Sequence, residues 1–225
     1  MLKIAISGTS GGLGKWLKQN INGLALYRDK LKSYTDTFYD TIIHCAFERF
    51  GVANDSKIYI DNSVLLAQDL LKLNAKRYIF ISSVECNKSD QASPYALAKR
   101  RVENLFAKKN NYLNIRLPSL YGPGMIRNQI FNIATQKHPQ LSLNQSSTFS
   151  LISYSDVKHF IEKKNILGTV SLLSDIVSLK DIADTFGSEP CWGSYVYVTK
   201  EGNVPRFKIN ENKALLKYKK FIATV

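Results

Sequence analysis

Three residues whose side chains can move a proton on an alcohol or carbonyl oxygen lie close together in this sequence. Tyr95 and Lys99 are four residues apart and would share one face of a helix. The lysine charge favours an ionised tyrosine, which could then act as a general acid or base below its ordinary pKa of about 10. Ser82 and Ser83 precede the pair, and a serine hydroxyl could hydrogen-bond the same oxygen. We therefore predict a catalytic set of Ser83, Tyr95 and Lys99.

The surrounding elements must bring these side chains to one edge of a sheet. An apolar run at residues 77–82 predicts a buried strand that ends at the serines, and residues 95–108 predict a helix that begins after Ser93 and Pro94. Further strands are predicted at residues 2–7, 24–27, 41–46 and 112–117, and further helices at residues 13–21 and 58–73. This alternation predicts an α/β fold with a doubly wound parallel sheet, Rossmann-like, which binds ligands at the carboxyl ends of its strands.

Each catalytic feature has a simpler explanation when it is taken alone. An isolated pair such as Tyr95 and Lys99 is more often a surface pair on a helix, and two serines often only end a strand. Because all three features occur in the required order, each on the expected element, we favour the catalytic interpretation.

A glycine-rich turn follows the first predicted strand and opens the first predicted helix. It contains Gly8, Gly11, Gly12 and Gly14. Glycines let the backbone turn tightly and approach a pyrophosphate, and a helix N-terminus offers that anion free N–H groups and a favourable dipole. The pattern also occurs in ordinary strand–helix turns, but its position directly after the first strand favours dinucleotide binding.

The end of the second predicted strand should distinguish NAD from NADP. An acidic side chain there binds the ribose 2′-hydroxyl, whereas an arginine accommodates a 2′-phosphate. Arg28 favours NADP and Asp29 favours NAD. Because Lys30 and Lys32 lie nearby, we expect NADP rather than NAD. The alternative is that all four are surface residues of a short loop at the sheet edge.

Composition and charge exclude several classes of protein. The 225 residues are 44% hydrophobic and 22% charged, and no apolar run approaches the roughly 18 residues of a membrane span. The N-terminus enters a strand directly, so we expect no signal peptide and a cytoplasmic location. The net charge of +13 comes from scattered lysines and arginines that do not alternate with aromatic residues. This charge therefore argues against nucleic acid, and it fits either an anionic cofactor and substrate or lysines that are simply spread over a solvated surface.

Cysteine and histidine spacing predicts neither disulfides nor a metal site. Cys45, Cys86 and Cys191 are odd in number, widely spaced and lack a Cys-x-x-Cys pattern, and the three histidines show no ligand spacing.

Together these features resemble the extended short-chain dehydrogenases/reductases, the NAD-dependent epimerase/dehydratase family that handles nucleotide sugars. The resemblance covers nearly the whole chain and is strongest at Ser93, Pro94, Tyr95 and Lys99. Residues 151–157 resemble a later strand of the family that ends in Asp156 and Val157. The resemblance implies cofactor contacts from Gly8, Ser10, Gly11, Gly12, Leu13, Gly14, Arg28, Cys45, Ala46, Asn62, Tyr95, Lys99 and Pro118. It implies substrate contacts from Ser83, Glu85 and Ser119.

The sequence also departs from the family pattern. Only 29 residues separate Gly14 from His44, so we expect a trimmed strand–helix unit and an altered adenosine pocket. Ser119 stands where asparagine is common. Glu85 is present, but the aspartate that dehydratases place directly after the catalytic residue is missing, which disfavours dehydration. The short spacing from Ser83 to Tyr95 predicts a small loop over the substrate.

By resemblance, the expected function is hydride transfer on a nucleotide-linked sugar, as a 4-keto reductase or a 4-epimerase. Two alternatives remain open: a non-catalytic NAD(P)-sensing protein on the same fold, and a reductase of a non-sugar carbonyl. We expect an NAD(P)-binding domain at residues 1–120, with returns from later segments such as 149–160, and a small substrate lobe of mixed helices and strands at residues 121–225. The resemblance also suggests a homodimer formed through the helices at residues 58–73 and 95–108.

Overall fold

The computed structural model describes residues 3–47, 55–87 and 93–225. Within these residues, no helix is both long and apolar enough to cross a membrane. The N-terminal half alternates strands and helices as the apolar pattern predicts. Its elements are β1 (Ile4–Ser7), α1 (Gly12–Asn20), β2 (Leu24–Leu26), the 3-10 helix η1 (Arg28–Tyr34), β3 (Phe38–Tyr39), β4 (Thr41–His44), α2 (Ser56–Leu70), β5 (Asn74–Ala75), β6 (Tyr78–Ser83), the 3-10 helix η2 (Val84–Asn87), α3 (Pro94–Phe106) and β7 (Tyr112–Leu117).

The remaining residues form shorter elements, some of which return to the first half. These elements are β8 (Ser119–Tyr121), α4 (Gln129–Thr135), β9 (Thr148–Ser153), α5 (Tyr154–Ile161), β10 (Gly168–Leu173), β11 (Ile176–Ser178), α6 (Leu179–Phe186), β12 (Arg206–Lys208) and α7 (Ala214–Ile222).

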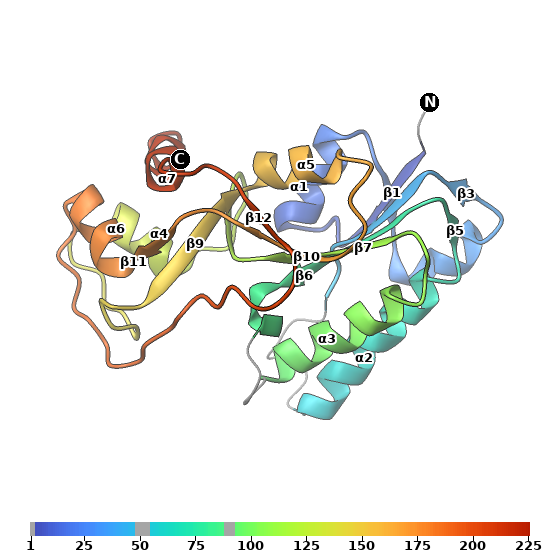
Figure 1. Ribbon diagram of the computed structural model, residues 1–225, viewed down its shortest axis with the longest axis horizontal. Helices are drawn as coiled ribbons and strands as arrows, with labels where there is room; N and C mark the ends of the chain where they lie inside the picture. The colour runs from blue at the N-terminus through green and yellow to red at the C-terminus, as the bar shows by residue number, and fades with distance from the viewer. Residues whose placement is uncertain (1–2, 48–54, 88–92) are drawn as a thin grey trace.

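A seven-stranded parallel sheet forms the centre of the molecule. Its strand order is β12-β10-β7-β6-β4-β1-β2. Helices α2 and α3 lie together on one face, and α1 and α5 lie on the other (Figure 1). Strand β6 is buried along its whole length, as a strand covered on both faces must be. The predicted Rossmann-like α/β class is therefore confirmed.

A smaller lobe extends from one end of this sheet. It contains α4, α6, α7 and the three-stranded sheet β11-β9-β8, on the left of Figure 1. Its own apolar core includes Tyr121, Ile133, Leu179 and Tyr218. Strands β10 and β12, although they lie between elements of this lobe in sequence, belong to the large sheet.

The short stretch between Gly14 and His44 ends the large sheet at β2. Strand β2 is the edge strand, and the seven-residue 3-10 helix η1 follows it. The trimming of a strand–helix unit relative to the family stays a prediction. Residues 88–92, which belong to the predicted small loop over the substrate, lie outside the described residues.

The expected strand at residues 151–157 is wrong at its end. Strand β9 stops at Ser153, and Asp156 and Val157 lie in α5. Ser153 Oγ accepts the Asp156 N–H at 3.1 Å, and the Asp156 carboxylate accepts the Ser153 N–H at 3.2 Å. This reciprocal capping box starts a helix at a position where the sequence pattern alone predicts that the strand continues.

Candidate active site

Ser83 and Tyr95 meet at the carboxyl end of β6. Helix α3 begins with Pro94, and the Ser93 side chain caps it by accepting the Ala96 N–H at 3.2 Å. Tyr95 therefore lies in the first turn of α3, where its hydroxyl hydrogen-bonds Ser83. Ser83 Oγ also accepts the Glu85 N–H at 3.2 Å. Ser83 Oγ keeps a second lone pair and its own proton, so either hydroxyl can donate in the contact with Tyr95.

Lys99 lies one helical turn beyond Tyr95 and is 5% exposed. Its Nζ donates to the Ile81 carbonyl at 2.8 Å, and it lies 5.7 Å from the centroid of the Tyr95 ring. The rings of Phe47 and Phe80 flank the ammonium at 4.0 and 4.8 Å. Burial lowers the pKa of Lys99 to about 8, so the group is still protonated at neutral pH.

The pKa of Tyr95 differs from the sequence expectation. We expected Lys99 to lower it, but burial raises the pKa of Tyr95 to about 12, with the Ser83 hydrogen bond opposing this and the charges of Cys86 and Glu85 adding to it. The physical reason is that removing a phenolate from water costs free energy. The Lys99 ammonium, which donates to the Ile81 carbonyl, does not offset this cost. A pKa of about 12 keeps the Tyr95 hydroxyl protonated at neutral pH.

Ser82 points to the opposite face of β6, as alternation along a strand requires. Its hydroxyl donates to Glu103 Oε1 at 2.5 Å. The same carboxylate accepts hydrogen bonds from Arg116 Nε at 2.9 Å and from Arg116 Nη2 at 2.7 Å. Ser82 thus belongs to a buried ion-pair network, and this geometry supports Ser83 as the catalytic serine.

Two glycines of the glycine turn lie where a side chain would collide with neighbouring backbone. Gly8 has a φ of +77°, and a Cβ on it would lie 2.5 Å from the Ala46 nitrogen. A Cβ on Gly14 would lie 2.2 Å from the Gly8 carbonyl oxygen. Over Gly11, the residue that precedes α1, a Cβ would meet no atom within 4 Å. The first turn of α1 carries no acidic side chain, so its free N–H groups and positive dipole end suit an anion.

A pocket of about 170 Å³ lies beside this turn. Ser10, Leu26, Arg28 and Ala46 are among its lining residues. Arg28 Nη2 donates to the Asn62 carbonyl at 3.3 Å, so two residues expected to contact the cofactor lie together. A pocket therefore remains beside the edge strand of the sheet, and its use by adenosine stays a prediction.

His44 is a buried residue whose positioning role the sequence did not reveal. Its Nδ1 lies 2.7 Å from Ser7 Oγ, which also accepts the Ala46 N–H at 3.4 Å. The imidazole stacks on Phe106 with a centroid distance of 5.8 Å. Burial, with a smaller contribution from the charge of Lys99, lowers the pKa of His44 to about 3 and keeps it neutral. A neutral imidazole thus links the ends of β1 and β4 beneath the glycine turn.

The other predicted residues flank the same edge of the sheet. Cys45 follows β4, its N–H bonded to the Ser7 carbonyl at 3.3 Å, and burial raises the pKa of its thiol to about 12. Leu13 is buried in the first turn of α1. Pro118 joins β7 to β8, and Ser119 begins β8. Glu85 lies in η2 directly beyond Ser83.

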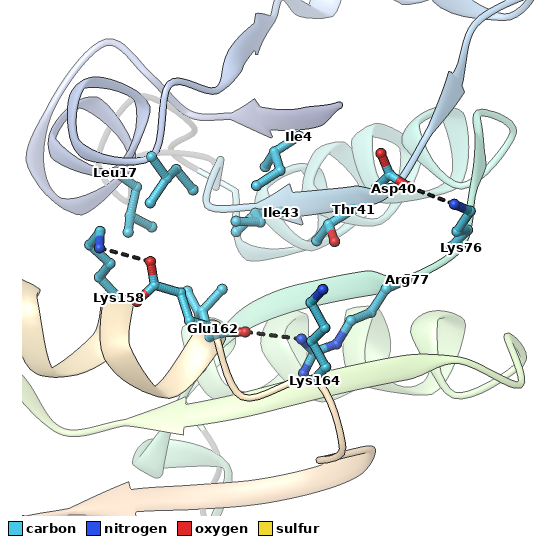
Figure 2. A pocket seen from close by; sticks show the side chains of 12 residues that line it. Ile4, Leu17, Asp40, Thr41, Ile43, Lys76, Arg77, Lys158, Glu162 and Lys164 are labelled. Carbon is cyan, nitrogen blue, oxygen red and sulfur yellow. Dashed lines mark hydrogen bonds and ion pairs between the residues drawn. The ribbon is translucent and has the colours of Figure 1, made fainter. Parts of the chain in front are cut away.

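A second cavity, of about 500 Å³, lies at the opposite end of the strands and contains none of the predicted site residues (Figure 2). Ile4 and Thr41, at the starts of their strands, contribute to its lining. Both of its carboxylates are paired, Asp40 with Lys76 and Glu162 with Lys158, each at 2.7 Å. The residues that can transfer a proton therefore gather at the carboxyl edge, away from this cavity.

The fold and the glycine turn define a Rossmann-like α/β protein. Residues 13–148 match the NAD dependent epimerase/dehydratase family. This match spans more than half of the chain, and the protein belongs to that family. The family predicted from the sequence is thus confirmed. No curated protein is significantly similar to the chain in sequence.

Solved structures of three different activities share the fold. A UDP-glucuronic acid 4-epimerase from Bacillus cereus, in complex with UDP-glucuronic acid and NAD, is 17% identical with a TM-score of 0.69, over 99% of this chain and 97% of that chain. A dTDP-4-dehydrorhamnose reductase from Clostridium acetobutylicum is 18% identical with a TM-score of 0.71, over 99% of both chains. An NAD-dependent NDP-hexosamine 5,6-dehydratase of tunicamycin biosynthesis is 15% identical with a TM-score of 0.72, over 97% of this chain and 91% of that chain. At these identities the likeness establishes the fold and leaves the reaction open.

Proposed function

We propose that this protein is an NAD(P)-dependent enzyme of the short-chain dehydrogenase/reductase type that transfers hydride on a nucleotide-linked sugar. The observation that carries this proposal is the contact of Ser83 with Tyr95, one helical turn from the buried Lys99, at the sheet edge that also holds the glycine turn. Open α/β sheets bind ligands at this edge.

The residues divide the chemistry among them. Gly8, Gly11 and Gly14 would hold the pyrophosphate of the cofactor, whose nicotinamide supplies or accepts the hydride. In the reductive direction, Tyr95 gives its proton to the carbonyl oxygen of the sugar, and its raised pKa keeps that proton available at neutral pH. Ser83 donates a hydrogen bond to the same oxygen, and the charge of Lys99 favours the phenolate that remains.

Two observations support a nucleotide sugar as the substrate. The similar epimerase binds UDP-glucuronic acid, and the similar reductase is named for a dTDP-linked sugar. The net charge of +13 would attract a diphosphate-bearing molecule. We propose substrate contacts from Glu85 and Ser119, which lie on the side of the site nearer the small lobe.

Among the reactions of this family we favour 4-keto reduction or 4-epimerisation. Tyr95 is held as a proton donor, and the residue after Ser83 is Val84 rather than the aspartate of dehydratases. Arg28 beside the adenosine pocket favours NADP, whereas the family as a whole is named for NAD. Comparing the affinities of the protein for NADH and NADPH decides between the two cofactors.

A screen of the purified protein tests this function. UDP-glucose, UDP-glucuronic acid and a dTDP-4-keto sugar are supplied with NADH or NADPH, and oxidation at 340 nm and sugar products are followed. We expect reduction of a keto sugar, or interconversion of C4 epimers with no net change in the cofactor. Turnover of simple ketones but of no nucleotide sugar would indicate a reductase of a non-sugar carbonyl. Binding of NAD(P)H without any turnover would instead indicate a sensor.

Alanine substitutions at Gly11 and Gly14 test the cofactor turn. Gly11→Ala adds a Cβ into open space, so we expect a stability loss of less than about 1 kcal/mol. Because a pyrophosphate would occupy that space, we expect NADH affinity to fall about tenfold, measured by fluorescence titration. Gly14→Ala adds a Cβ against the Gly8 carbonyl and should lower both the Tm and the affinity. Unchanged NADH affinity in Gly11→Ala would contradict the assigned turn.

We also propose a homodimer through α2 and α3. The outer face of this helix pair exposes the apolar side chains of Ile58, Leu65 and Leu97. Exposed apolar residues that gather on a helix pair are typical of association surfaces.

A further inference from the structure

A segment of the C-terminal part crosses the turn that follows Ser83. We call residues 197–202 the strap. At one end, the Thr148 N–H donates to the Tyr197 carbonyl at 2.8 Å, which ties the strap to β9 of the small lobe. At the other end, Asn87 Nδ2 donates to the carbonyls of Lys200 at 2.8 Å and Glu201 at 3.1 Å. The strap thus connects the small lobe to η2, beside the predicted catalytic serine.

The side chain of Tyr197 reaches the same turn. Its hydroxyl donates to Glu85 Oε1 at 2.5 Å. Its ring stacks on Phe149 of β9, with centroids 4.7 Å apart and planes within 15°. Burial and the neighbouring Glu85 raise the pKa of Tyr197, so the hydroxyl keeps its proton and remains the donor. The Glu85 carboxylate is therefore held by a ring that belongs to the small lobe.

Glu85 joins this contact to the catalytic hydroxyl. Its backbone N–H donates to Ser83 Oγ at 3.2 Å while its side chain accepts from Tyr197. The turn is fixed a second time through Asn87, whose Oδ1 accepts from Arg116 Nη1 at 2.7 Å. The turn that directly follows the predicted catalytic serine thus carries a carboxylate that can accept hydrogen bonds from sugar hydroxyls.

We propose that Tyr197 is a positioning residue that holds the Glu85 carboxylate toward the bound sugar, so that the pair selects substrates by a hydroxyl near the reacting carbon. This inference rests on the proposed function, because it assigns the sugar-binding side of the same site. Tyr197 acts through Glu85 and touches neither the cofactor turn nor Tyr95 in the contacts described above. It should therefore affect sugar binding far more than cofactor binding.

A double-mutant cycle tests the proposal. Tyr197→Phe keeps the ring on Phe149 and removes the hydroxyl, with its hydrogen bonds to Glu85 and Thr199. Glu85→Gln removes the charge, and the double variant combines both. For the best nucleotide sugar of the screen, Tyr197→Phe should raise KM about tenfold and change kcat less than about threefold, the expected effect of one lost hydrogen bond to a charged group. The NADH affinity and the Tm should stay close to those of the wild type. In the Glu85→Gln background, the Tyr197 change should alter KM less than about twofold.

Tyr195→Phe is the matched control, because Tyr195 lies two residues earlier and is 62% exposed. It should keep the wild-type KM. A wild-type KM for Tyr197→Phe, or equal effects of that change with and without the Glu85 carboxylate, would overturn the positioning role while leaving the proposed function intact. A wild-type protein that binds no NAD(P)H or no nucleotide sugar overturns the proposed function, and this inference with it.

Discussion

Replacing Tyr95 with phenylalanine should lower kcat by about 10³-fold, within the range that a general acid or base contributes. The change removes the only atom that can pass a proton to the substrate oxygen from this position on α3. The phenylalanine ring can keep the edge-on contact with Phe47, whose centroid lies 5.7 Å away, so folding should be preserved. The NADH affinity should change less than about twofold, since the glycine turn and the Arg28 pocket are untouched.

The measurement is made at pH 7 with the substrate found in the screen. At that pH Lys99, whose pKa burial lowers to about 8, still carries its charge, so the two proteins differ only in the hydroxyl. Ser83→Ala serves as a comparison. It should lower kcat by about 10²-fold, because one hydrogen bond to the developing charge is lost while the proton donor remains. Full turnover by Tyr95→Phe would show that the proton comes from another group and would remove the basis of the proposed mechanism.

The second large effect is expected on stability. Arg116→Ala should lower the free energy of unfolding by about 3–5 kcal/mol, because it leaves a buried carboxylate without its cation. The Glu103 side chain is 6% exposed, and Arg116 donates hydrogen bonds to both of its carboxylate oxygens. With the arginine removed, the Ser82 hydroxyl is the one partner that the described contacts leave to the Glu103 carboxylate. Urea unfolding followed by circular dichroism measures the loss.

A paired substitution separates the cost of an orphaned charge from the cost of lost packing. The double variant Arg116→Met with Glu103→Leu removes both charges and keeps apolar volume, so it should recover most of the stability lost in Arg116→Ala. If the double variant is as unstable as the single one, packing around Arg116 decides the effect. If Arg116→Ala costs less than about 1 kcal/mol, the network is not the stabilising element assigned here.

The sequence predicted best where local patterns decide the structure. The strand predicted at residues 77–82 is observed as Tyr78–Ser83, and the helix predicted at residues 95–108 as Pro94–Phe106. Both are long apolar or amphipathic stretches with clear boundaries, and Ser93 with Pro94 marks the helix start. These two elements place Ser83 at a strand end and Tyr95 and Lys99 one turn apart on the following helix.

Features that depend on distant partners were missed. Strands β10 and β12 complete the large sheet through pairing with β7 and with each other, which no local pattern reveals. The raised pKa of Tyr95 depends on how deeply its ring is buried, and the sequence contains no measure of that. In the sequence, Tyr197 stands out only as an aromatic residue among alternating apolar and polar ones. Its partner Glu85 could be identified only in the folded chain.

The strap has a consequence for the order in which the protein assembles. The contacts of Tyr197 with Glu85 and of Glu201 with Asn87 join residues 112 and 114 positions apart. Contacts of such long sequence separation form late in folding, because closing long loops costs entropy before it yields stability. During synthesis, the glycine turn and its pocket can form from the first half of the chain, well before the strap has been made. A nascent chain could thus hold a dinucleotide at the glycine turn before its strap exists to orient a sugar.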